Sequence, residues 1–148
     1  MKKVVNVIKV AIVLAVMACI FYLSSQTATE SRVLSNKVVE QLKGYIEAMT
    51  WLAPFIRKIN WRHPTISIRK LAHFTIYLVL GFVSYLALPR QWPCRRKMAL
   101  VISLCFAYAI TDEFHQSFVP GRAPEVRDVL IDTLGSSVGM SIGSLVKR

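Results

Sequence analysis

The chain has 148 residues, of which 54% are hydrophobic and only 18% are charged, and its mean hydropathy is +0.45. An ordinary soluble domain is excluded, because it would carry more charge and would not place its apolar residues in blocks of about twenty. The net charge is +11, but the basic residues lie mostly between the apolar blocks, where they meet lipid headgroups, so we expect no nucleic-acid partner.

The first apolar block covers residues 4–23 and is interrupted only by Asn6 and Lys9. Lys9 lies near the end of the block, so its amine can reach the membrane interface. A cleaved signal peptide is the alternative, since Met1-Lys2-Lys3 precedes the block and Val16-Met17-Ala18-Cys19 faintly resembles a lipobox. The block continues to Leu23 without a clear small-residue cleavage site, which favours a retained membrane span.

The segment 24–67 is longer and more polar than the loops that follow it. Apolar residues recur in it at helical spacing, at Leu34, Val38, Leu42, Tyr45 and Met49. This pattern predicts an amphipathic helix that lies on the membrane or packs over the spans. Trp51 and Trp61 in the same segment are typical of a membrane interface.

Three further apolar blocks predict spans at about 71–88, 98–118 and 126–146. Pro89 ends the first of them. The last carries Gly135, Gly139 and Gly143 at four-residue spacing, which indicates a helix face that another helix approaches closely. The predicted fold is an all-α membrane protein, a single domain over 1–148, with about four transmembrane helices and an outer amphipathic segment.

Basic residues predict the orientation of these spans. Three segments that fall on one side of a four-span protein are rich in them: Lys2 and Lys3; Arg90, Arg95, Arg96 and Lys97; Lys147 and Arg148. Positive residues collect on the cytoplasmic side. We therefore expect a multi-pass plasma-membrane protein with both termini in the cytoplasm, and with 24–67 and 119–125 outside.

Five of the eight acidic residues fall within one short stretch: Asp112, Glu113, Glu125, Asp128 and Asp132. Ionised groups at membrane depth are costly, so they pair with a base, bind a cation or carry a proton inside the protein. Asp112 and Asp132 lie about 9 Å from the outer ends of their spans, and His73 lies about 7.5 Å from the end of its own. With Ser24, these groups predict a polar site where four helices meet.

The residue types assign provisional roles within this site. Ligand-binding candidates, chiefly for phosphate or another anion, are Ser25, Gln26, Arg69, Lys70, Gln116 and Arg122. Catalytic candidates are His73, Glu113, Asp128 and Asp132, with His73 as general acid, general base or nucleophile. Glu113, Asp128 and Asp132 are also candidate ligands of a divalent cation. A purely structural salt-bridge network is the alternative, because such networks also gather charges.

The motifs in this chain resemble those of the VanZ family of small polytopic bacterial membrane proteins. The matching stretches are Phe21-Tyr22-Leu23-Ser24-Ser25-Gln26, Arg69-Lys70-Leu71-Ala72-His73-Phe74, Asp112-Glu113-Phe114-His115-Gln116-Ser117-Phe118-Val119-Pro120-Gly121-Arg122 and Asp128-Val129-Leu130-Ile131-Asp132-Thr133-Leu134-Gly135. The resemblance implies a cell-envelope protein and a link to antibiotic resistance, since the founding member is associated with resistance to teicoplanin, a lipid-bearing glycopeptide. It implies no particular reaction.

Three functions are compatible with these features. The first is an enzyme or handling protein for a lipid or lipid-linked anionic ligand, such as a wall precursor, at the outer leaflet. The second is a non-catalytic binding or immunity protein that recognises a glycopeptide, a precursor or a partner. The third is a small transporter or flippase, which ranks last because the polar groups lie at one end of the spans rather than along them.

Overall fold

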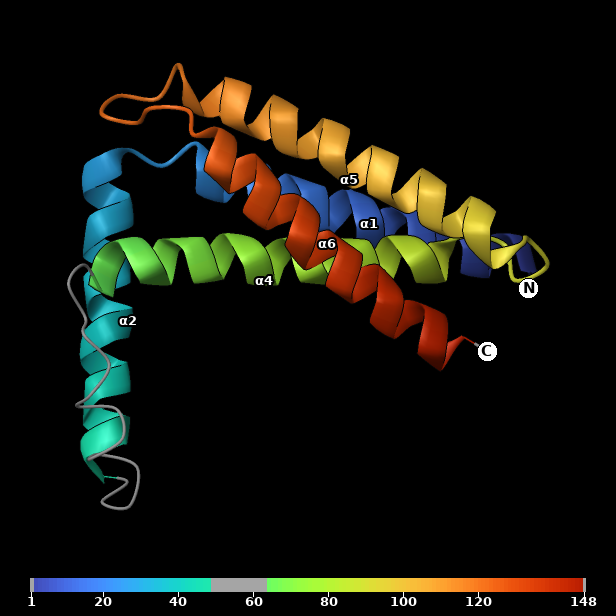
Figure 1. Cartoon of the computed structure of the whole chain (residues 1–148), viewed down its shortest axis with the longest axis horizontal. Helices are drawn as coiled ribbons and strands as arrows, with labels where there is room; N and C mark the ends of the chain where they lie inside the picture. The colour runs from blue at the N-terminus through green and yellow to red at the C-terminus, as the bar shows by residue number, and fades with distance from the viewer. Residues whose placement is uncertain (1, 49–63, 148) are drawn as a thin grey trace.

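In the computed structural model, which describes residues 2–48 and 64–147, those residues form five helices (Figure 1). They are α1 (Lys2–Ser24), α2 (Ala28–Ala48), α4 (Pro64–Ala87), α5 (Cys94–Gln116) and α6 (Val126–Val146). Within this described part, α1, α4, α5 and α6 are long and apolar enough to cross a membrane. Their outer surfaces expose large apolar side chains such as Leu14, Ile110 and Leu134, as a lipid-facing bundle requires. The predicted all-α membrane fold is confirmed.

Two helices extend beyond the apolar blocks that predicted them. Helix α4 begins at Pro64, before the predicted start at residue 71, and therefore includes Arg69 and Lys70. Helix α5 begins directly after Pro93 and includes the basic turn that ends at Lys97. The Lys97 side chain is buried, and its amine lies 4.7 Å from the centre of the Tyr85 ring. This cation–π contact stabilises the buried charge.

Helices α4 and α6 pack against each other along the glycine face predicted from the sequence. A Cβ atom added at Gly135 would collide with the carbonyl oxygen of Phe74, and one added at Gly139 would collide with that of Leu78. Gly81 of α4 is packed in the same way against Ser136 of α6. Only residues without a side chain let the two backbones lie this close, so the close approach is confirmed.

Helix α2 lies across the end of the bundle, transverse to the other helices (Figure 1). It begins with a capping box, in which the backbone N–H of Thr27 donates to Glu30 and the backbone N–H of Glu30 donates to the Thr27 hydroxyl. Among residues 28–41, whose burial the structure describes, Ser35 and Val39 are buried and lie next to the predicted apolar stripe, while Leu34 remains 49% exposed. Met49, Trp51 and Trp61 lie outside the described residues.

Helix α1 is attached to the bundle by apolar contacts and by hydrogen bonds in its C-terminal half. The Tyr108 hydroxyl of α5 donates to the carbonyl oxygen of Met17 at 2.6 Å. We expect Tyr108→Phe to lower the free energy of unfolding by about 1 kcal/mol, because the Met17 carbonyl loses a side-chain donor. Thermal unfolding in detergent measures this effect. Tyr22→Phe, at an exposed position, is the control, and equal melting temperatures for the two variants would contradict the expectation.

Candidate functional site

Four helices bring polar side chains to the same end of the bundle, opposite to the end where the N- and C-termini lie (Figure 1). Ser24 is the last residue of α1, His73 lies in the first half of α4, Asp112 lies in the last turns of α5 and Asp132 lies in the second turn of α6. Ser24, Asp112 and Asp132 are buried. We refer to this region as the charged end of the bundle.

Two basic residues of α4 face two acidic residues at the start of α6. The Lys70 amine lies 3.1 Å from Glu125 and 3.3 Å from Asp128. The Arg69 guanidinium lies 3.9 Å from Glu125 and 3.7 Å from Asp128. The Asp128 side chain is only 4% exposed, whereas that of Glu125 is 43% exposed. The hydrogen bond from Lys70 lowers the pKa of Glu125, so this acid is ionised at neutral pH.

Deeper in the bundle, His73 lies between two buried aspartates. Its Nδ1 atom is 3.4 Å from a carboxylate oxygen of Asp132. The ligand atoms of His73, Asp112 and Asp132 all lie within 4.8 Å of one another. Asp132 has no exposed surface, and neither of its oxygens has a hydrogen-bond partner among the described residues. We call these three residues the His–Asp cluster.

A hydrogen-bonded chain links this cluster to the loop before α6. The Gln116 amide donates to Asp112 at 3.2 Å and to Ser24 at 3.4 Å, and its oxygen accepts a bond from Arg122 at 2.9 Å. Gly121 adopts a φ of +76°, which turns the loop immediately before Arg122. The loop thereby returns the Arg122 guanidinium to the ends of α1 and α5, where it also reaches the carbonyl oxygen of Leu23 at 3.4 Å.

A cavity of about 140 Å³ opens beside the His–Asp cluster. Its polar lining includes Ser24, Arg69, His73 and Arg122, and its apolar lining includes Ile20 and Ile76. Two arginines and a histidine thus line one small space. Such a lining suits an anionic group with planar or tetrahedral oxygens, because guanidinium binds these oxygens through two parallel N–H donors.

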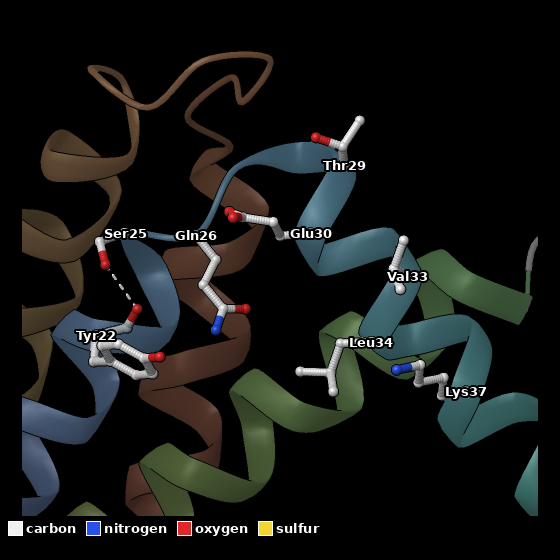
Figure 2. Close-up of a pocket in the computed structure, with 8 residues that line it drawn as sticks. All are labelled: Tyr22, Ser25, Gln26, Thr29, Glu30, Val33, Leu34 and Lys37. Carbon is white, nitrogen blue, oxygen red and sulfur yellow. Dashed lines mark hydrogen bonds between the residues drawn. The ribbon is translucent and has the colours of Figure 1, made fainter.

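A larger, more open groove of about 590 Å³ lies in the corner between α1 and α2. Figure 2 shows Gln26 and Glu30 at the corner, Tyr22 on α1 and Leu34 with Lys37 on α2. Gln26 and Leu34 line both the groove and the cavity. The groove therefore lies next to the cavity that Arg69, His73 and Arg122 line.

Most of the predicted site residues lie together, but the grouping differs in detail from the sequence-based roles. Glu113 accepts the backbone N–H of Glu125 at 2.8 Å and so holds the start of α6. Ser25, which directly follows α1, donates to the Tyr22 carbonyl of that helix at 2.8 Å. The residues that enter the centre instead are Ser24 and Asp112, neither of which was given a ligand role. The four-residue spacing of Asp112 and Gln116 is the signal that places Asp112 on the inner face.

Comparison with known proteins gives one family match. The sequence model described as VanZ/LLP1 matches residues 9–147, and thus includes the charged end, α4, α5, α6 and all of α1 except its first residues. No curated protein and no solved structure matches this chain.

Proposed function

Since the chain belongs to the VanZ/LLP1 family, we propose that it is a cell-envelope membrane protein that takes up the anionic headgroup of a lipid or lipid-linked precursor at its charged end. The cavity lined by Arg69, His73 and Arg122 is the observation that carries this proposal. Anionic oxygens would bind the two guanidinium groups, and the His–Asp cluster would act on the bound headgroup.

The groove between α1 and α2 supports a ligand that comes from the membrane. It shares Gln26 and Leu34 with the cavity, and exposed side chains of α1 and α2, Tyr22 and Val33, line it. An acyl chain could remain against these side chains while the headgroup reaches Arg69 and Arg122. A soluble anion would need no apolar surface of this kind.

The charge distribution supports placing the charged end at the outer leaflet. The loop between α4 and α5, the N-terminus and the C-terminus lie together at the other end (Figure 1), and the basic residues of those segments are typical of a cytoplasmic surface. A headgroup bound at the outer leaflet would be that of an envelope lipid or a wall precursor. This location fits the resistance to lipid-bearing glycopeptides that the resemblance to VanZ implies.

Binding of a phosphomonoester lipid tests the proposal. The full chain would be placed in phosphatidylcholine nanodiscs and titrated with fluorescent short-chain phosphatidic acid. We expect Arg122→Gln and Arg69→Gln to weaken binding about 10-fold or more, because a hydrogen bond to a charged group contributes about 1.5–3 kcal/mol. Arg95→Gln, at an exposed position on the opposite end of the bundle, is the matched control and should bind as the unchanged chain does.

Two further results decide between the functional classes. Release of inorganic phosphate from the bound lipid would support an enzyme, whereas saturable binding without release would support a recognition or immunity protein instead. Equal affinity of the chain for phosphatidic acid and for uncharged diacylglycerol would overturn the proposal, because the two arginines would then contribute nothing.

A further inference from the structure

We propose that His73, Asp112 and Asp132 bind one divalent transition-metal ion, of the zinc or manganese type. The inference deepens the proposed function, on which the chemical role of the ion rests, but the cluster itself supports the binding of the metal. One imidazole nitrogen and two carboxylate oxygens form a donor set that suits Zn²⁺ and Mn²⁺ better than Mg²⁺, which prefers oxygen ligands alone.

The distances agree with those in a metal site. Zinc binds imidazole nitrogen and carboxylate oxygen at about 2.0–2.2 Å, so two such atoms on a tetrahedral ion lie about 3.4 Å apart. Nδ1 of His73 and Oδ1 of Asp132 are 3.4 Å apart, and this pair does not meet hydrogen-bond geometry among the described residues. The three ligand atoms fall within 4.8 Å of one another, so a shift of about 1 Å would bring all of them onto one ion.

Burial and charge provide independent support. Asp132 is fully buried, and neither of its oxygens has a hydrogen-bond partner in the described part of the chain. Asp112 is 3% exposed, and one of its two oxygens also lacks a hydrogen-bond partner among the described residues. Leaving buried carboxylate oxygens without partners is costly. The nearby cations Arg69 and Lys70 lie against Glu125 and Asp128 instead. A divalent ion between two carboxylates and a neutral imidazole leaves the cluster without net charge.

The position of His73 gives the ion a place in the proposed function. Catalytic zinc sites use three protein ligands and leave one position for water or substrate. Because His73 also lines the cavity with Arg69 and Arg122, the fourth position would open toward the anionic headgroup. The ion would bind a headgroup oxygen or activate a water molecule, and His73 would serve as a ligand rather than as the general base.

Metal binding by the full chain, in detergent and without added lipid, tests the inference. The chelator-treated protein would be titrated with Zn²⁺ against a fluorescent indicator, and Co²⁺ would report nitrogen and oxygen ligation through its visible absorption. We expect one ion per chain and a loss of affinity of about 100-fold or more in His73→Gln, Asp112→Asn and Asp132→Asn, since even second-layer partners of a metal contribute 10- to 100-fold. His115→Gln and Glu125→Gln, which remove an imidazole and a carboxylate outside the cluster, should leave binding unchanged.

A second measurement separates metal loss from misfolding. Zn²⁺ should raise the melting temperature of the unchanged chain and of the two controls, and should not raise that of any folded cluster variant. Less than stoichiometric binding by the unchanged chain, or wild-type affinity in both His73→Gln and Asp132→Asn, would overturn the inference and leave an ion pair only. Zinc binding together with a failure to bind phosphatidic acid would support the metal site and refute the proposed function; the reverse pair of results would do the opposite.

Discussion

Gly139→Ala is expected to leave most molecules of the protein unfolded, although it adds a single methyl group. The new Cβ would overlap the carbonyl oxygen of Leu78 on α4, and a backbone atom cannot move aside without separating the two helices. We expect a loss of about 3 kcal/mol or more in the free energy of unfolding, at the upper end of what overpacking produces. Alanine favours an isolated helix by about 1 kcal/mol over glycine, so a loss of stability would have to come from the helix contact.

Gly143→Ala is the matched control for this substitution. It lies one turn further along the same face, where an added Cβ would meet the Tyr85 side chain at 3.3 Å, a contact that small shifts can relieve. The two variants would be compared by yield of monodisperse protein and by thermal unfolding in detergent. Similar stability of the two variants would show that the close approach of α4 and α6 is not required for folding.

Asp128→Asn is expected to destabilise the chain far more than Glu125→Gln, although both acids pair with Arg69 and Lys70. The distinction is burial, since the Asp128 side chain is 4% exposed and that of Glu125 is 43% exposed. Loss of the buried charge leaves two cations without their deeper partner. We expect this loss to lower the free energy of unfolding by about 3 kcal/mol. Loss of the exposed charge should change the free energy of unfolding by less than about 1 kcal/mol.

Chemical denaturation of the two variants in detergent at neutral pH measures this difference, and acidification adds a check. Because the pKa of Glu125 is lowered in the folded chain, its small contribution is present above its unfolded pKa and is lost as the pH falls through the folded pKa. Glu125→Gln should therefore remove part of the acid sensitivity. Equal effects of the two substitutions at neutral pH would contradict the role assigned to burial.

The sequence was sufficient to predict the helical fold and the location of the polar residues, for identifiable physical reasons. Apolar blocks of about twenty residues specify spans whatever their partners are. The spacing of Gly135, Gly139 and Gly143 holds these residues on one helix face in any packing, and that face is the one packed on α4. Because a helix rises by a fixed distance per residue, the number of residues from each helix end predicts that His73, Asp112 and Asp132 lie at the same depth in the bundle.

The distance of a residue from the end of its helix does not predict which of two adjacent residues faces the interior of the bundle. Neighbouring positions on a helix differ by about 100° in direction and by only about 1.5 Å in height. Asp112 therefore enters the His–Asp cluster while Glu113 holds the backbone of Glu125, and Ser24 contacts Gln116 while Ser25 bonds back to α1. The rotation of each helix depends on contacts between helices, which no single apolar block contains.

The contacts of α1 have a consequence for the order in which the chain is assembled during synthesis. Met17, Leu23 and Ser24 have hydrogen-bond partners that lie 91, 99 and 92 residues further along the chain. A ribosome completes α1 long before it reaches Tyr108, Gln116 and Arg122. Helix α1 must therefore enter the bilayer before these partners exist, and it is the most apolar of the four described spans. The later spans, which carry the acidic residues, can insert beside a span that is already present.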